Sequence, residues 1–327
     1  MRLFGLRQFA RRDPVVQRVV AIGSFDGVHM GHRRLVEMAR ERARRIQGEL
    51  VILTFWPLPG FALGRRGCPR VLTNPPVRAQ LLAELEVDSL VTLHFDDRLS
   101  GMGPRDFVRR ILVEDLKVSE ACVGFNFTFG RGGSAGADTL RHLGREMGFG
   151  VEVLEPVQVD GHRVSSTAVR ELIRSGRVTC ARSLLGRPHR MDGTVVRGRG
   201  LGAGLGFPTA NVKAPGDVLL PAPGVYAVEV EWATNEGSIP GVANIGGSPT
   251  LGDGSSAARI VEVHIPGFHG NLYGRRLAVS FLHRLRGLRS FRDADALKAQ
   301  IAEDCEIALA AMDADGSESL RTSSRLC

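Results

Sequence analysis

Cysteine is scarce in this 327-residue sequence, and its five cysteines form no metal-binding or redox pattern. They are Cys68, Cys122, Cys180, Cys305 and Cys327. No two of them make a CxxC motif, and none stands beside histidines at zinc-finger spacing. Scattered thiols of this kind are typical of a protein in a reducing cytosol.

Long apolar runs are also missing. No segment approaches the length of a membrane span. The charged start MRLFGLRQFARRDP lacks the sustained apolar core of a secretory signal. We therefore expect a cytoplasmic protein with no membrane partner.

Acidic residues are outnumbered, with 35 of them against 43 basic residues and a net charge of +8. A basic surplus attracts phosphate-bearing partners. Because the surplus is spread along the chain, it favours nucleotides over nucleic acid. An ordinary solvated surface would also explain most of these arginines.

The first part of the chain alternates strand-like and helix-like patterns. The predicted strands are 18–23, 49–55, 89–95, 120–125 and 151–159. The predicted helices are 31–46, 77–87, 103–116, 137–148, 165–177 and 178–186. This alternation predicts an α/β domain over residues 1–182 with a doubly wound, Rossmann-like parallel sheet.

After about residue 186, glycine and proline become dense and short strand-like runs replace helices. The predicted strands are 192–198, 224–232, 239–246, 258–265 and 275–285. Their spacing predicts a small antiparallel β-barrel with a C-terminal helix at 293–312. This second domain would cover residues 183–312, and the polar residues 313–327 would form a disordered tail.

The stretch AIGSFDGVHMGH, residues 21–32, joins the first predicted strand to the first predicted helix. A strand, a glycine-rich turn and a helix together direct backbone N–H groups and a positive helix end at phosphate. Gly23 and Gly27 let the backbone approach a ligand closely. His29 and His32 are one helical turn apart, so both rings can donate hydrogen bonds to the same anion.

Two common phosphate motifs are absent from this stretch, since it contains neither GK[ST] nor GxGxxG. A zinc site fits poorly, because no third ligand is spaced nearby. Two surface histidines beside a tight turn would be the ordinary alternative. The full strand–GxFDGxHxGH–helix combination favours a functional site.

This combination resembles the HxGH nucleotidyltransferases, which transfer a nucleotidyl group without a covalent enzyme intermediate. Further segments resemble the bacterial bifunctional riboflavin kinase/FMN adenylyltransferases. These segments are GFNFTFG (124–130), RVSSTAVRELI (163–173), LGRPHRMDGTVVRG (185–198), GFPTANV (206–212), PGVYAV (223–228), GVANIGGSPT (241–250), VEVHI (261–265), LYGRRLAV (272–279) and LRGLRSF (285–291). They follow the order of that family from about residue 18 to residue 312.

The resemblance implies that the N-terminal domain adenylylates FMN to FAD. His29 and His32 would bind and stabilise the ATP phosphates, and Asn126 would lie on the flavin side. The adenosine and phosphate turn would comprise Gly23, Ser24, Phe25, Asp26 and Gly31. The leaving pyrophosphate would be held by Arg163, Ser165, Ser166, Thr167 and Arg170. Helix capping alone would also explain Ser165 or Ser166.

For the C-terminal domain, the resemblance implies phosphorylation of riboflavin to FMN. Thr209 and Asn211 would give oxygen ligands to Mg²⁺ on ATP. Glu262 would be the general base for the riboflavin 5′-hydroxyl. From spacing alone, Glu262 could be an exposed carboxylate on an alternating strand and Asn211 a turn residue. The glycines at 198–206 could likewise be a flexible surface loop.

Three features depart from the family pattern. Leu58 in TFWPLP stands where relatives have a histidine, and restoring that histidine should raise FAD formation if the site has simply weakened. The loop GRGLGAGL, which precedes GFPTAN, lacks the charged residues that relatives carry. Gly267 stands where an acid is common. A divergent paralogue acting on a flavin analogue would also fit these changes.

The sequence therefore predicts a bifunctional enzyme with riboflavin, FMN and ATP as partners, Mg²⁺ as cofactor and no nucleic-acid partner. One alternative is an HxGH nucleotidyltransferase for another small phosphate ester or a flavin analogue, with a degenerate kinase domain. Another is a non-catalytic flavin-binding regulator. If the two activities separate by domain, residues 183–327 alone should phosphorylate riboflavin and make no FAD.

Overall fold

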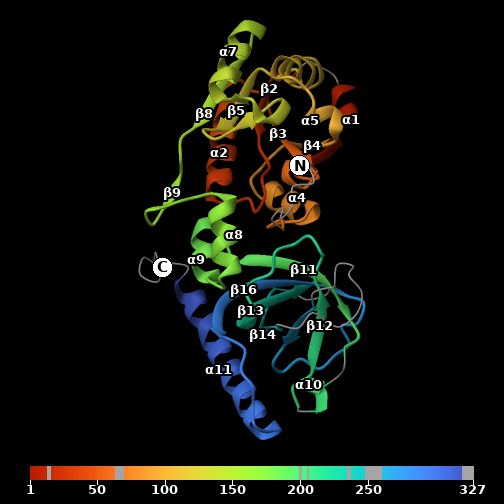
Figure 1. The fold of residues 1–327 in the computed structure, drawn as a ribbon, viewed down its shortest axis with the longest axis vertical. Helices are drawn as coiled ribbons and strands as arrows, with labels where there is room; N and C mark the ends of the chain where they lie inside the picture. The colour runs from red at the N-terminus through yellow and green to blue at the C-terminus, as the bar shows by residue number, and fades with distance from the viewer. Residues whose placement is uncertain are drawn as a thin grey trace. The chain divides into compact units, whose positions relative to one another are not determined.

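The chain divides into two compact units (Figure 1). The first comprises Met1–Pro69 and Asn74–Ser165, and the second comprises Arg70–Thr73 and Ser166–Cys327. The computed structural model describes residues 1–12, 16–62, 70–198, 201–204, 206–233, 237–246 and 260–318. Among these residues, no helix combines the length and apolar character that crossing a membrane would require.

The first unit is built on a six-stranded parallel sheet with the order β1-β4-β3-β2-β5-β8. The strands are β1 (Arg2–Gly5), β2 (Arg18–Ile22), β3 (Glu49–Trp56), β4 (Ser89–His94), β5 (Glu120–Gly124) and β8 (Gly150–Leu154). From β2 the chain winds one way to β3 and β4, then returns to the other side of β2 for β5 and β8. The predicted doubly wound sheet is confirmed, and its direction reverses between β2 and β5.

Helices cover both faces of this sheet. One face is covered by α2 (Met30–Arg45) and α4 (Pro75–Ala83). The other is covered by α1 (Leu6–Ala10), α6 (Pro104–Phe107), the π-helical η1 (Val108–Asp115) and α7 (Ala137–Met147). Alternate residues of β2 serve the two cores, with Val19 and Ala21 in the first and Val20 and Ile22 in the second. Because successive residues face opposite sides of the sheet and both sides are covered, the buried strands appear in the sequence as continuous apolar runs.

The remaining elements of the first unit are short. They are α3 (Pro59–Ala62), α5 (Asp97–Ser100), β6 (Thr128–Phe129), the 3₁₀ turn η2 (Arg131–Gly133), β7 (Ala135–Gly136), β9 (Gln158–Val159) and β10 (His162–Arg163). The predicted strand 151–159 was too long, because β8 ends at Leu154 and the chain turns before β9.

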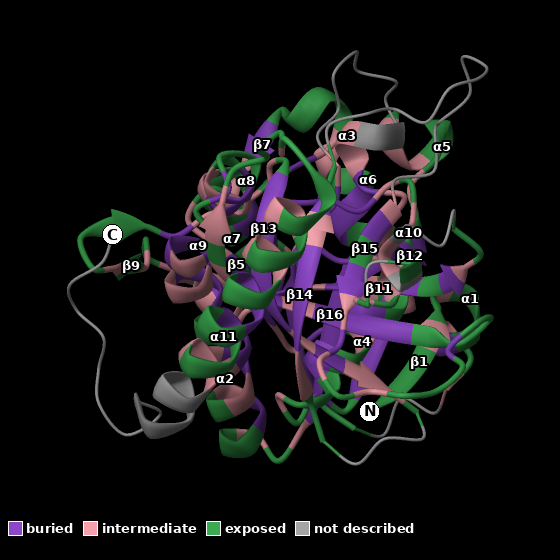
Figure 2. Cartoon of the chain, turned by 90° about the horizontal axis from the view of Figure 1, so that it is seen from below, coloured by how far each residue is buried: buried purple, intermediate pink, exposed green. Residues whose placement is uncertain are grey.

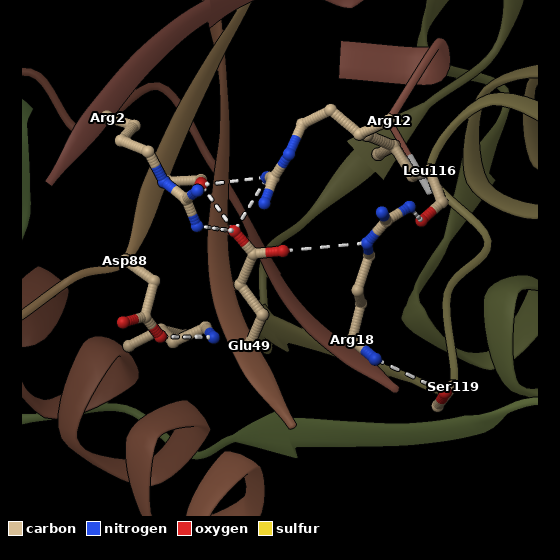
Figure 3. Close-up of polar contacts among 9 residues, drawn as sticks. Arg2, Arg12, Arg18, Glu49, Asp88, Leu116 and Ser119 are labelled. Carbon is tan, nitrogen blue, oxygen red and sulfur yellow. Dashed lines mark hydrogen bonds and ion pairs between the residues drawn. The ribbon is translucent and has the colours of Figure 1, made fainter. Parts of the chain in front are cut away.

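The strand β1 was not predicted, and a buried ionic cluster explains how this charged segment joins the sheet (Figure 3). Glu49, at the start of β3, is buried and accepts hydrogen bonds from Arg12 at 2.8 Å and Ser89 at 2.5 Å. Arg2 and Arg18 form ion pairs with the same carboxylate at 3.4 and 3.6 Å. Burial alone would raise the pKa of Glu49, but these donors and charges hold it below its ordinary value. The cluster therefore fastens the N-terminal segment to the amino ends of the strands.

The second unit is a closed six-stranded barrel with the order β11-β12-β15-β14-β13-β16, as predicted. Its strands are β11 (His189–Val196), β12 (Thr209–Lys213), β13 (Gly224–Trp232), β14 (Ile239–Ile245), β15 (Ile260–His264) and β16 (Arg276–Arg286). β12 was missed as a strand, because its short TANVK sequence follows a glycine-rich loop. Figure 2 shows β13, β14 and β16 buried along much of their length.

The described part of the second unit also contains helices. They are α8 (Ser166–Arg174), α9 (Val178–Leu185), α10 (Leu201–Gly204) and α11 (Ala294–Glu318). α9 packs on β16 and β11, and α11 packs on β13 and β14, where Cys305 and Ala308 join the core. α11 continues through 313–318, where the sequence predicts that a tail begins, and residues 319–327 lie outside the described part.

Candidate functional site

The glycine-rich turn of the first unit leaves the carboxyl end of β2, at the point where the sheet reverses direction. Ligands of open α/β sheets bind in the crevice at such a point. The turn holds Phe25 and Val28 at positive φ of 48° and 42°, and Gly27 at 85°. Phe25, Asp26 and Val28 are buried, and Thr54 Oγ1 donates a hydrogen bond to the Ser24 carbonyl at 3.1 Å. The burial of these side chains and the hydrogen bond from Thr54 therefore hold the turn in its conformation.

His29 and His32 form a stacked pair at the start of α2. Their ring centroids lie 3.7 Å apart with planes 9° from parallel. His29 is the N-cap of α2, and its Nδ1 accepts the backbone N–H of His32 at 3.2 Å. A neutral His29 whose Nδ1 accepts must carry its proton on Nε2. In that tautomer the Nε2–H is the hydrogen-bond donor of the ring.

His32 is held neutral by its surroundings. Burial lowers the pKa of His32 well below its ordinary value, and the nearby Arg78 charge lowers it further. Phe25 adds an apolar neighbour, with its ring centroid 5.1 Å from that of His32. The Nδ1 atom of His32 is buried and has no hydrogen-bond partner among the described residues. The pair can therefore gain donors or acceptors from a bound ligand.

Arg78 was missed by the sequence analysis. It lies on α4, is only 2% exposed, and its guanidinium is 3.8 Å from the Asp26 carboxylate. The same guanidinium lies over the Trp56 ring at 5.6 Å from the centroid. A buried arginine needs partners of this kind, so Arg78 belongs to the architecture of the HxGH turn. The arginine in VRAQLL could not be told from an ordinary helical surface arginine by sequence.

The flavin-side and pyrophosphate residues are only partly brought together. Asn126 is exposed in the turn after β5, the strand next to β2. Arg163 lies over the Phe125 ring, 4.3 Å from its centroid. A Cβ placed on Gly31 would lie 3.8 Å from Val164, so the segment before Ser165 passes close to the histidine pair. These residues all belong to the first unit.

Ser166, Thr167 and Arg170 instead lie on α8, in the second unit. Arg170 is 9% exposed, and its Nε donates a hydrogen bond to the Arg70 carbonyl at 3.0 Å. Arg70–Thr73 belongs to the second unit because Val71 pairs with Val218 in a parallel bridge. Arg170 therefore has a structural contact, and its role toward pyrophosphate stays a prediction.

In the barrel, the predicted kinase residues Asn211 and Glu262 lie in one row across neighbouring strands. Asn211 of β12 is paired with Glu262 of β15, and Glu262 is paired with Asn244 of β14. Directly paired residues of antiparallel strands lie on the same face of the sheet. Asn211 is therefore a strand residue rather than a turn residue, and Glu262 is exposed beside it.

Thr209 and Asn211 are two positions apart on β12, so they share a face. A Cβ on Gly198 would come within 2.1 Å of the Asn211 amide, and one on Gly202 would lie 3.3 Å from Thr209 Oγ1. The glycine-rich segment thus approaches both side chains closely. A hydroxyl and an amide carbonyl are hard oxygen donors, which suit Mg²⁺ that also binds phosphates and water. The donor set therefore fits a nucleotide-bound Mg²⁺.

A cavity of about 400 Å³ lies beside Thr209. Its lining includes Thr209 and Ala210 of β12, together with Phe268, Leu272 and Tyr273. The sequence analysis did not identify it, because its walls come from separate parts of the chain. Its largely apolar walls, with a few polar side chains such as Thr209 and Tyr273, are typical of a small-molecule site.

Comparison with known proteins is consistent across both units. Residues 13–168 match the FAD synthetase family, and residues 185–312 match the riboflavin kinase family. The chain is 38% identical over 286 residues to the bifunctional riboflavin kinase/FMN adenylyltransferase of Escherichia coli (strain K12), covering 88% of this chain and 90% of that protein. It is 40% identical over 293 residues to the one from Pseudomonas fluorescens, covering 89% and 92%. The chain belongs to the bifunctional riboflavin kinase/FMN adenylyltransferase family.

The fold is shared with a solved structure as well. A crystal structure described as a macrolide-efflux protein from Streptococcus pneumoniae superposes with a TM-score of 0.84 at 27% identity, covering 94% of this chain and 99% of that one. The curated relatives and the two family matches agree on a flavin-nucleotide family, as the motifs predict.

The departures of this member of the bifunctional family have different surroundings. Leu58 is buried, at 6% exposure, and follows β3. Gly267 has a positive φ of 73° with nothing within 4 Å of an added Cβ, so glycine is the residue that this turn favours. Of the loop GRGLGAGL, residues 199, 200 and 205 lie outside the described part.

Proposed function

We propose that the barrel phosphorylates riboflavin to FMN and that the α/β unit adenylylates FMN to FAD, with ATP as the donor in both steps. The observation that carries this is a cluster of predicted site residues in each unit, which we propose as two separate phosphate sites. These are the stacked His29–His32 pair and the Asn211–Glu262 pair. Family membership supplies the flavin substrates.

In adenylylation, a phosphate oxygen of FMN attacks the α-phosphorus of ATP and the α–β bond breaks to release pyrophosphate. The Nε2–H of His29 would donate to a phosphate oxygen as negative charge builds in the transition state. The negative charge of bound phosphates would raise the pKa of His32, so this histidine would become a better hydrogen-bond donor. The turn Gly23–Asp26 would cradle the nucleotide, with Gly31 leaving room for the His29 ring.

The outgoing pyrophosphate would be held by Arg163, together with the hydroxyls of Ser165, Ser166 and Thr167. Guanidinium and hydroxyl donors suit an anion of high charge. Arg170 would contribute charge from α8 while its Nε holds the Arg70 carbonyl. Asn126 would contact the flavin side of FMN.

In phosphorylation, the Glu262 carboxylate would accept the proton of the riboflavin 5′-hydroxyl as its oxygen attacks the γ-phosphorus of ATP. The bond from that phosphorus to the bridging oxygen breaks, and ADP leaves. Thr209 and Asn211 would hold Mg²⁺, which neutralises phosphate charge when bound. The cavity beside Thr209 would take the adenosine part of ATP.

Two variants test both assignments in one protein. With riboflavin, ATP and Mg²⁺, the parent should form FMN and then FAD, measured by chromatography. His32→Ala should accumulate FMN, with adenylylation lowered about a hundredfold. Glu262→Gln should lose FMN formation from riboflavin but still convert supplied FMN to FAD. Flavin binding without any product would support a non-catalytic regulator, and turnover of another phosphate ester without FAD would support the other nucleotidyltransferase reading.

We extend the proposal to the cytoplasm as the setting. Cys122, Cys180 and Cys305 are buried cysteines that form no disulfide among the described residues, as is usual in a reducing compartment. Fractionation of cells expressing the tagged chain tests this placement.

A further inference from the structure

Asn244 is the third member of the row that contains the proposed kinase base. It stands directly opposite Glu262 on β14, just as Asn211 stands opposite Glu262 on β12. Glu262 therefore lies between two asparagine side chains on one face of the barrel wall. On its far side Asn244 is paired with Val225 of β13, which offers no polar side chain.

The two asparagines make different contacts. The Asn244 Nδ2 atom donates a hydrogen bond to Glu262 Oε2 at 3.3 Å. Among the described residues this is the one side-chain hydrogen bond that Glu262 makes. The Asn211 amide instead lies against the backbone of Gly198, where no Cβ would fit. Of the two asparagines, Asn244 is thus the one that directs a donor at the carboxylate.

Asn244 is also more buried than the residue it contacts, and its Oδ1 atom has no hydrogen-bond partner among the described residues. It is half-buried, with its Oδ1 atom buried, whereas Glu262 is exposed. An exposed glutamate would otherwise spread over several rotamers, since three side-chain torsions are free. Fixing Oε2 by a hydrogen bond restricts that spread and leaves Oε1 available to accept a proton.

We propose that Asn244 is a positioning residue for riboflavin phosphorylation, and that it acts by orienting the Glu262 carboxylate toward the 5′-hydroxyl. This rests on the proposed role of Glu262 as general base. Asn244 itself need not touch either substrate. Its removal should lower kcat while leaving KM for riboflavin and ATP nearly unchanged, because ground-state binding does not use this hydrogen bond.

The test uses the full chain with Asn244→Ala and Asn244→Asp. Asn244→Ala should lower the kcat of riboflavin phosphorylation about tenfold, at the lower end for a hydrogen bond to a charged group. Asn244→Asp has the same shape but places a like charge opposite Glu262, so it should lower kcat further. Thr194→Ala, at an exposed position on β11 of the same barrel, is the matched control and should change nothing. FMN adenylylation should stay at the parent rate in all three.

A double-mutant comparison separates positioning from a general effect on the barrel. If Asn244 acts through Glu262, Asn244→Ala should cost nothing further in a Glu262→Gln background. The same loss in both backgrounds, a rise in KM alone, or kcat within twofold of the parent would each overturn the proposal. Full kinase activity in Glu262→Gln alone would instead remove the proposed base, and the inference with it. Circular dichroism and a melting temperature at the parent value show that each variant is folded.

Discussion

Replacing Gly31 by alanine tests the geometry of the histidine pair most directly. The added Cβ would lie 3.2 Å from both Nδ1 and Cε1 of His29, and 3.8 Å from Val164 Cγ1. The His29 ring would have to move by a few tenths of an ångström. Its hydrogen bond from the His32 N–H is already 3.2 Å long, and its stack on His32 is close. A small shift therefore disturbs both contacts that orient the ring.

The effects on stability should nearly cancel. Alanine in place of glycine in the first turn of α2 stabilises the helix by about 1 kcal/mol. Weakening the His29 cap costs about 1 kcal/mol. The melting temperature should therefore change by only about a few degrees. Activity should not be spared, since a misplaced transition-state donor lowers the rate about ten- to a hundredfold.

The assay is FAD formation from FMN and ATP, with riboflavin phosphorylation in the same sample as the internal control. Phosphorylation should be unchanged, because its proposed residues belong to the other unit. Gly103→Ala is the matched variant, since Gly103 precedes α6 and an added Cβ meets nothing within 4 Å. Adenylylation within twofold of the parent in Gly31→Ala would refute the reasoning.

Three further predictions concern stability and the limits of the units. Burial lowers the pKa of His189 to about 4, so between about pH 6.5 and pH 4 the unfolded chain binds a proton at this histidine and the folded chain does not. The free energy of unfolding should therefore fall by about 2 kcal/mol from pH 7 to pH 5. Calorimetry should show a weaker pH dependence of stability in His189→Gln. Leu58→His buries an imidazole at a 6% exposed position, so it should destabilise the protein by about 2 kcal/mol without raising FAD formation. Higher FAD formation at an unchanged melting temperature would instead indicate that Leu58 weakens the adenylylation site. A fragment of residues 183–327 lacks the buried Val178 and Ala181 of α9 and the segment Arg70–Thr73, so it should aggregate or show no cooperative unfolding. A fragment that folds and phosphorylates riboflavin would show that these parts are dispensable.

Much of the fold could be predicted because local patterns carry it. Apolar runs alternating with amphipathic segments indicate a doubly wound sheet, since parallel strands are buried on both faces. The short strands after residue 186 indicate a barrel by their spacing alone. β1 and β12 escaped prediction for a physical reason: both are short, and each is held by distant partners, in β4 for the first and in β11 and β15 for the second.

The sequence by itself determined the family, the HxGH turn and the identity of Thr209, Asn211 and Glu262 as candidates, because motifs are local in the chain. Only the tertiary structure decided which side chains meet. The pairing of Asp26 with Arg78 and of Glu262 with Asn244 joins residues from separate elements, and the grouping of Arg70–Thr73 with the barrel depends on a bridge to Val218. Such contacts arise from strand register and helix packing, which no local period in the sequence encodes.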